Sequence, residues 1–163
     1  MYLTPKLVRY LNQRGIPYEI ISHPVSYTAL KTAEAEHKDS RIVAKVVMVE
    51  VDGGDMMFVL PADRKLDREK IVFAFGAETV LLEEEKDFRE YFPDCETGAM
   101  PPFGRLYGIP CCIDMNLAKQ HEIIFNAGSH TEGVKMKMKD YLMLMQPQIG
   151  DYSIAAQECA LDV

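Results

Sequence analysis

The alternation of apolar and polar residues along the chain predicts short helices and strands that follow one another in mixed order. The first element is a helix, with Thr4 as its N-cap, Pro5 in the first turn and Gly15 at its end. The run 52–55, Asp-Gly-Gly-Asp, predicts a turn that joins two strands into a hairpin. Strands are expected over residues 18–22, 42–51, 56–60, 79–82, 109–114, 122–126 and 134–138. Further helices are expected over 29–37, 67–75, 84–91 and 140–145, the last capped by Asp140, with one helical turn at 115–120.

Lys45 is the only charged residue within the apolar run 42–49, which is typical of a buried strand. The period of two places it on the same face as Val43, Val47 and Val49, so its ammonium group is expected on the more buried side. An unpaired ammonium is costly to bury. It must reach solvent along its alkyl stem, titrate with a lowered pKa, or meet a carboxylate or phosphate. Lys45 is therefore either a structural lysine near a strand end or an anion-binding group.

Length and composition indicate one compact domain, because the 163 residues are 48% hydrophobic and 26% charged. No signal-peptide pattern or long uncharged apolar stretch is seen, which favours a soluble cytoplasmic protein. The net charge of −7 argues against bulk electrostatic binding of nucleic acid, and neither DNA nor a membrane is expected as a partner. Basic residues do cluster at 31–45 and 64–70, so one end of an RNA could bind locally.

The cysteines and histidines show no spacing typical of metal ligands. The cysteines contain no CxxC pair and are expected to be structural thiols: Cys95, Cys111, Cys112 and Cys159. The histidines are equally scattered: His23, His37, His121 and His130. No metal and no cofactor are expected, and a metal-dependent hydrolase is the weakest functional alternative.

The loop 98–104 is the first candidate for a binding site. Pro101 and Pro102 stand between Gly98 and Gly104, so the backbone has little freedom to lose and can hold its N–H groups in a fixed shape. Such a shape suits an anion or a small substituent. A rigid Pro-Gly turn plugged by an aromatic residue such as Phe103 is also ordinary structure.

The second candidate is the turn that follows the strand 122–126. Gly128 allows a sharp bend there, and it delivers Ser129 and His130 to the end of the strand. These two residues are neighbours in sequence and need not touch, so the pair is not a serine triad by itself.

Six motifs in this order resemble those of the YbaK family, the freestanding relatives of the bacterial prolyl-tRNA synthetase editing domain. They are Gly15-Ile16-Pro17-Tyr18-Glu19, His23-Pro24, Ala44-Lys45, Leu60-Pro61-Ala62-Asp63 with Leu66-Asp67, Gly98-Ala99-Met100-Pro101-Pro102-Phe103-Gly104, and Ala127-Gly128-Ser129-His130. The resemblance spans residues 1–147 and leaves 148–163 as a C-terminal tail that either packs locally or is mobile. It implies a mixed α/β fold, a single domain with a central curved mixed β-sheet surrounded by helices. It also implies hydrolysis of wrongly charged aminoacyl-tRNA.

The resemblance also implies roles for individual residues. Lys45 stands where members have an essential lysine that engages the phosphate or backbone of the terminal nucleotides. Gly98 and Pro102 fit the GxxxP loop that positions the aminoacyl carbonyl and screens the side chain, and His130 would orient substrate or water. Other residues are expected to contact substrate, with a structural role favoured for the last of them: Ala99, Met100, Pro101, Phe103, Gly128, Ser129 and His23.

The function implied is trans-editing, the deacylation of mischarged tRNA that carries alanine, serine, threonine or cysteine. A positioned water would attack the ester with help from the terminal ribose, which explains why the sequence shows no obvious general base. The run 140–142 with Gln146-Pro147 is similar to members associated with serine and threonine. The alternative is a non-catalytic module that binds a tRNA end, a nucleotide or a synthetase. The expected partner is the tRNA acceptor end, and the acidic balance suggests a synthetase as a second partner.

Overall fold

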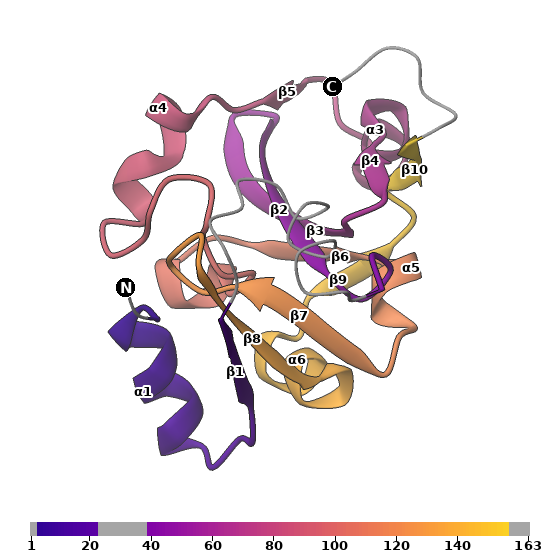
Figure 1. Ribbon diagram of the computed structural model, residues 1–163. Helices are drawn as coiled ribbons and strands as arrows, with labels where there is room; N and C mark the ends of the chain where they lie inside the picture. The colour runs from indigo at the N-terminus through magenta and orange to yellow at the C-terminus, as the bar shows by residue number, and fades with distance from the viewer. Residues whose placement is uncertain (1–2, 23–38, 157–163) are drawn as a thin grey trace.

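The computed structural model describes residues 3–22 and 39–156, and its centre is a β-hairpin (Figure 1). Strand β2 (Ala44–Val51) pairs antiparallel with β3 (Gly54–Pro61), from Ala44 opposite Pro61 to Val51 opposite Gly54. Asp52 and Gly53 form the two-residue loop, with φ values of 48° and 86°. Positive φ at both positions is the conformation that matches the twist of a tight hairpin. The hairpin predicted from the sequence is thus confirmed.

Three further strands extend the hairpin into a five-stranded sheet of order β5-β2-β3-β6-β9. These strands are β5 (Val80–Leu82), β6 (Cys111–Asp114) and β9 (Gln148–Gly150). β6 runs parallel to β3 and to β9, whereas the other neighbours are antiparallel. The sheet is mixed and helices surround it, which confirms the predicted fold class.

A second sheet lies beside the first and carries one of the candidate loops. It is antiparallel, of order β1-β8-β7, and its strands are β1 (Glu19–Ser22), β8 (Glu132–Lys137) and β7 (Glu122–Asn126). A single parallel bridge between Val43 and Ile124 joins it to the start of β2, with a hydrogen bond of 2.9 Å from the Ile124 N–H to the Ile42 carbonyl oxygen. The end of β7 is thereby fixed next to the strand that holds Lys45.

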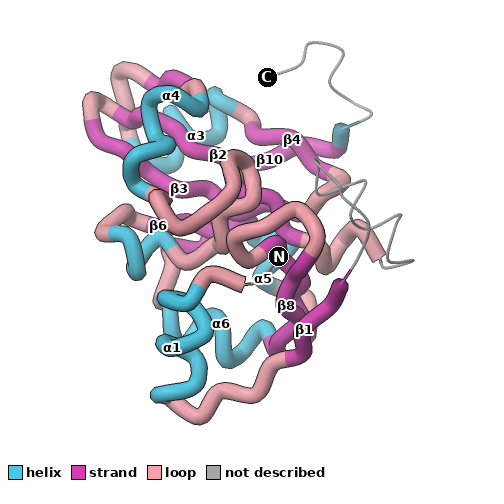
Figure 2. The backbone as a smooth tube through the Cα atoms, turned by 60° about the vertical axis from the view of Figure 1, so that its left-hand side comes forward, coloured by secondary structure: helices cyan, strands magenta, loops and turns pink. Residues whose placement is uncertain are grey.

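Helices close both ends of the molecule (Figures 1 and 2). α1 (Pro5–Gln13) and α6 (Met138–Met145) lie at one end. At the other end are α3 (Arg68–Phe75) and α4 (Glu85–Phe88), which continues into the 3₁₀ turn η1 (Arg89–Tyr91). Shorter elements are α5 (Met115–Ala118), the 3₁₀ turn η2 (Gly104–Tyr107), and a two-stranded sheet of β4 (Arg64–Leu66) and β10 (Ser153–Ala155). None of the described helices is long and apolar enough to cross a bilayer.

The alternation along β2 and β3 divides the core between the two faces of the central sheet. Met48 and Met57 pack on one face against α1, β7, β8 and α6. Val49 and Phe58 pack on the other face against α3 and Tyr152. Because a strand turns successive side chains to opposite sides, both faces of the hairpin are covered.

The structure corrects the predicted start of the last helix. Asp140 is not its cap: α6 begins at Met138 with Lys137 as the N-cap, and Asp140 lies in the first turn. The sequence pattern hid this start because Met138 continues the buried alternation of β8 with 2% exposure. His23 and the helix predicted over 29–37 lie outside the described residues.

The folded unit also extends past residue 147, where the sequence placed the domain boundary. β9 pairs with β6 in the central sheet, and β10 pairs with β4. Tyr152 lies between these strands with 1% exposure, 5.1 Å from the ring of Phe58 and stacked on Phe75 at 6.0 Å. Residues 148–155 therefore complete the core beneath the sheet rather than form a separate tail.

Replacement of Tyr152 tests this contribution. We expect Tyr152→Ala to lower the free energy of unfolding by about 3–5 kcal/mol, because a fully buried aromatic ring leaves a cavity. Ile149→Ala, at a side chain that is 53% exposed on the neighbouring strand, is the control and should cost under about 1 kcal/mol. Urea denaturation measures both values, and similar small losses would make the C-terminal strands peripheral.

Candidate active site

The two candidate loops are hydrogen-bonded to each other along their backbones. The Glu96 N–H donates to the Gly128 carbonyl oxygen at 2.8 Å, and the Gly128 N–H donates to the Ala99 carbonyl oxygen at 2.8 Å. The Glu96 side chain adds a third link, because its Oε1 accepts a hydrogen bond of 2.8 Å from the His130 N–H. Residues 96–99 and 128–130 thus form one braced surface, which we call the paired-loop surface.

Gly98 and the His130 ring face each other within this surface. Gly98 has a φ of 86°, and a Cβ placed on it would lie 3.5 Å from the His130 Cε1. His130 Nε2 is 2.9 Å from the Thr97 carbonyl oxygen, which can only accept, so Nε2 carries the hydrogen. His130 is 7% exposed. Its ring is therefore fixed by the backbone of the loop that it supports, as a positioning residue requires.

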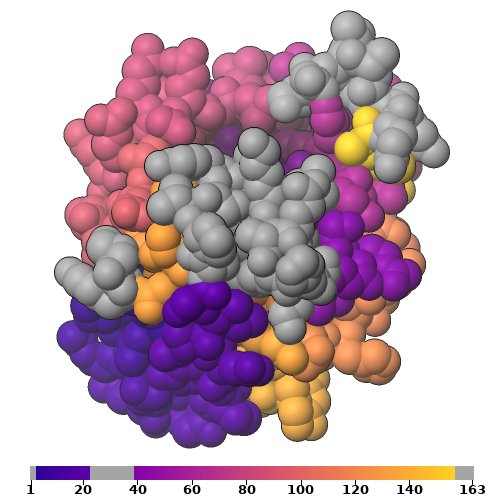
Figure 3. Space-filling model, viewed as in Figure 1, coloured from indigo at the N-terminus to yellow at the C-terminus, as the bar shows by residue number. Residues whose placement is uncertain are grey.

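Thr4, the N-cap residue of α1, supports the paired-loop surface. The Thr4 N–H donates to the Ala127 carbonyl oxygen at 2.9 Å, and the Thr4 hydroxyl donates to the Asp94 carboxylate. Gly128, with a φ of 104°, has little space there, because an added Cβ would lie 3.1 Å from the Thr4 backbone nitrogen. Figure 3 shows indigo atoms of the N-terminal segment directly against orange atoms of the β7–β8 region.

Ser129 is fully buried, and its hydroxyl serves the turn. Its Oγ accepts hydrogen bonds from the N–H groups of Thr131 at 3.3 Å and Glu132 at 3.1 Å. A hydroxyl that stabilises the backbone of a turn in this way is a common local motif. The structure thus places Ser129 within the supporting turn, and a contact with substrate stays a prediction.

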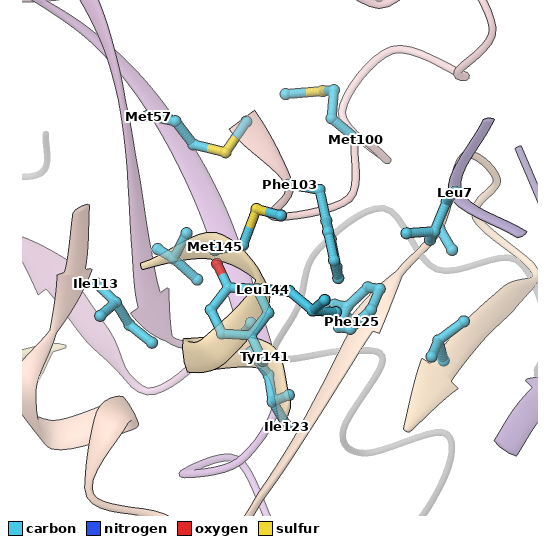
Figure 4. Close-up of a cluster of buried hydrophobic side chains, with 14 of the residues drawn as sticks. Leu7, Met57, Met100, Phe103, Ile113, Ile123, Phe125, Tyr141, Leu144 and Met145 are labelled. Carbon is cyan, nitrogen blue, oxygen red and sulfur yellow. The ribbon is translucent and has the colours of Figure 1, made fainter. Parts of the chain in front are cut away.

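The loop 98–104 directs most of its side chains into the core. Phe103 is fully buried between Phe125 and Tyr141, with ring centroids 5.3 Å from each (Figure 4). The Pro102 carbonyl oxygen accepts a hydrogen bond of 2.5 Å from the Tyr141 hydroxyl. Ala99, Met100 and Pro101 are also buried. Their packing anchors the loop, and the exposed part of its first turn is Gly98.

Lys45 lies on β2 with its side chain partly buried, opposite Leu60 of β3. Burial lowers its pKa from the ordinary value of 10.5, the nearby Lys65 lowers it further, and Asp63 opposes both effects. Within the described residues no carboxylate lies close enough to Lys45 to form an ion pair. Of the three ways in which the sequence let the ammonium be tolerated, its burial favours a lowered pKa.

Lys45 and the paired-loop surface start from the same point of the fold. Val43 and Ile124 form the bridge between the sheets, Lys45 lies two residues beyond Val43, and Asn126 lies two residues beyond Ile124. Because the bridge is parallel, β2 and β7 continue in the same direction from it. Asn126 leads directly into residues 127–130, so the strand of Lys45 and the paired-loop surface start from the same junction of the two sheets.

Open volume alone does not locate this region. A hollow of about 550 Å³ lies at the opposite end of β7 and β8 from the 127–131 turn. Its lining includes His121, Lys137 and Lys139, and none of the residues assigned to the site from the sequence. No group of three or more metal-binding side chains occurs among the described residues either.

Comparison with known proteins identifies the class of this arrangement. A model of the aminoacyl-tRNA editing domain family matches residues 23–144. The chain belongs to this family. Membership confirms the resemblance to the YbaK family and makes the chain an aminoacyl-tRNA editing domain, the class of deacylase that the sequence predicted.

Relatives of this editing domain match over nearly their whole length. The chain is 25% identical over 152 residues to the multifunctional Ser/Thr-tRNA deacylase ProXp-y of Escherichia coli, and it covers 90% of each protein. The crystal structure of a proposed trans-editing enzyme for prolyl-tRNA synthetase superposes with a TM-score of 0.78 at 21% identity, over 94% of this chain and 100% of that one. The hypothetical protein APE2540 has a TM-score of 0.81 at 17% identity, over 91% and 99%. These structures share the fold.

Sequence reasoning missed three residues that shape the site. Glu96 and Thr4 brace the paired loops, and Asp63 influences the charge of Lys45. Nothing in the acidic stretch around Glu96 marked this residue, because its hydrogen-bond partner, His130, is 34 residues away in sequence. Asp63 was part of a family motif, but the chain folds it towards Lys45 only through the turn after β3.

We expect Gly98→Ala to lower the rate of deacylation at least about 10-fold, because the added methyl group lies beside His130 at a left-handed backbone position. Gly53→Ala is the matched control, since Gly53 has the same φ of 86° and nothing within 4 Å. Both variants should lose about 1–2 kcal/mol of stability through backbone strain. Only Gly98→Ala should lose activity, and equal activities of the two would remove Gly98 from the site.

The lowered pKa of Lys45 also predicts a change in stability. The folded protein binds this proton less readily than the unfolded chain, so the penalty is full below the lowered pKa and is relieved as the pH rises through it. Lys45→Met should therefore raise the free energy of unfolding by on the order of 1 kcal/mol at neutral pH, and by less near about pH 10. Lys137→Met, at an exposed lysine, is the control in urea denaturation. A lower stability of Lys45→Met at neutral pH would contradict this account.

Proposed function

We propose that this protein is a trans-editing deacylase that hydrolyses mischarged aminoacyl-tRNA carrying a small amino acid. The observation that carries the proposal is the partly buried ammonium of Lys45, which has no ion-pair partner among the described residues and lies on a strand that starts from the same sheet junction as the paired-loop surface. Holding such a charge costs stability, and a phosphate or carbonyl of the substrate would offset the cost.

Each part of the region has a task in this reaction. Lys45 binds the phosphate or the backbone of the terminal nucleotides. Among the described residues nothing accepts a hydrogen bond from the Gly98 N–H, which can therefore donate to the aminoacyl carbonyl oxygen. His130 holds the Thr97 carbonyl and thereby fixes the loop that carries this donor. Preorganised donors act without reorganisation cost as negative charge develops on the carbonyl oxygen.

Water then attacks the ester carbon, and the tRNA leaves with its terminal ribose hydroxyl restored. An aminoacyl ester is already activated, so positioning of the water and the carbonyl supplies much of the rate. The adjacent ribose hydroxyl would assist the water, which fits a region whose described residues include no obvious general base. His130 Nε2 is engaged with Thr97, so its role is to orient rather than to transfer a proton through that nitrogen.

Serine and threonine are the first substrates to examine. A relative that matches 90% of the chain is a Ser/Thr-tRNA deacylase, although alanine and cysteine are of similar size. A hydrophobic pocket separates residues that differ by one methylene or hydroxyl by only about 1–3 kcal/mol. We therefore expect activity on more than one small amino acid. The net charge of −7 favours a synthetase partner that adds affinity for tRNA.

Deacylation of a panel of charged tRNAs tests the proposal, with alanine, cysteine, serine, threonine and proline as the amino acids. We expect hydrolysis of one or more small mischarged species, and a loss of at least about 100-fold in Lys45→Met, because the charge that binds the tRNA end is removed. Lys137→Met, which keeps Lys45, should retain activity. If folded wild-type protein hydrolyses none of these charged tRNAs, the result would instead favour a non-catalytic module that binds a tRNA end.

A further inference from the structure

A small apolar cluster at the junction of the two sheets is flanked by three polar side chains. Its buried members are Val43, Ala62 and Ile124. By the period of two, Lys45 shares a face with Val43, and Asn126 shares a face with Ile124. Asp63 directly follows Ala62, whose N–H donates to the Val43 carbonyl oxygen at 2.8 Å. Lys45, Asn126 and Asp63 therefore border the same cluster.

Two of these side chains hold a buried oxygen that accepts no hydrogen bond. Among the described residues, only four buried side-chain oxygens have no hydrogen-bond partner, and they include Asp63 Oδ1 and Asn126 Oδ1. A buried acceptor without a donor is costly, more so on a carboxylate, and native structures keep few of them. Two such atoms at one cluster, with no donor for either among the described residues, suit a ligand that supplies the donors.

Lys45 and Arg41, two of the described cations near Asp63, do not pair with it. Lys45 influences Asp63 electrostatically but forms no ion pair with it, and Arg41 is held by Asp39 at 2.6 Å. Two oxygens beside an ammonium are also a poor site for a metal ion, and the described residues contain no cluster of metal ligands. A small group with several N–H bonds is a donor that suits these two acceptor oxygens.

We propose that Asp63, with the amide oxygen of Asn126, binds the α-ammonium group of the amino acid on the tRNA. This inference rests on the proposed function and adds to it the orientation in which the substrate binds. The aminoacyl ester carries a cation at its α-carbon and electron-rich oxygens at its carbonyl and phosphates. Asp63 faces the first and Lys45 the second, so the two protein charges stay apart and bind opposite ends of one substrate. Acyl-tRNAs without a free α-ammonium are rejected.

The test compares each aminoacyl-tRNA with its α-hydroxy analogue, in which a hydroxyl replaces the ammonium at nearly the same size. Seryl-tRNA and glyceryl-tRNA form such a pair. The measured quantity is the ratio of their kcat/KM values in the wild type and in Asp63→Asn. The different intrinsic reactivities of the two esters cancel when the ratios are compared, as in a double-mutant cycle.

We expect the ratio in favour of the aminoacyl substrate to fall about 10- to 100-fold in Asp63→Asn, the loss of one charge-assisted hydrogen bond. Asn126→Ala should lower it in the same direction by a smaller factor, and it carries the test if Asp63→Asn does not fold. Asp151→Asn is the control, since Asp151 is exposed and pairs with Lys70 at 2.9 Å. It should leave the ratio unchanged.

An unchanged ratio in both Asp63→Asn and Asn126→Ala would overturn the inference. Equal losses on both substrates would mean that Asp63 acts through the charge of Lys45 or through the fold, which also overturns it. Neither outcome affects the proposed function, which stands or falls with wild-type hydrolysis of the aminoacyl substrate itself.

Discussion

One parallel bridge, between Val43 and Ile124, is the contact on which the arrangement of this site depends. It joins a five-stranded mixed sheet to a three-stranded antiparallel one at the point where the strand of Lys45 passes the strand that leads to His130. Two residues beyond the bridge each strand carries a polar side chain, Lys45 on β2 and Asn126 on β7. The core and the site thus share a boundary, and the apolar cluster around the bridge fixes the positions of the polar groups beyond it.

Hydrogen bonds between backbone groups hold the rest of the region in place. Residues 96–99 and 128–130 exchange hydrogen bonds, and Thr4 supports them from the N-terminal helix. Glycine is favoured at two places: Gly98 faces the His130 ring in a left-handed conformation, and Gly128 combines a φ of 104° with a tight approach to Thr4. A loop held in this way can keep an N–H donor in position before the substrate arrives, which is the property that ester hydrolysis needs.

Sequence patterns identified the residues whose signal is local. Lys45 stood out because one charge interrupted an apolar alternation, and the hairpin followed from the Asp-Gly turn. The start of α6 was misplaced because Met138 fits both the strand alternation and the helix. Residues 148–155 carried no sign that β9 would pair with β6 or that Tyr152 would fill the core. Glu96 and Asp63 act through partners distant in sequence, and only the folded chain shows such contacts.

Neither Lys45 nor Asp63 has an ion-pair partner in the part of the chain that the structure describes, and this bears on what the region binds. Opposite charges that feel each other in a partly buried place would gain by contact, and a small rotamer change usually allows it. Here the fold keeps them apart, and a buried carboxylate oxygen is left without a donor. An ion pair would close the space between them and neutralise both groups. In the complex that we propose, the separated pair offers a cationic end and an anionic end to a substrate that has both, and binding relieves the cost in stability.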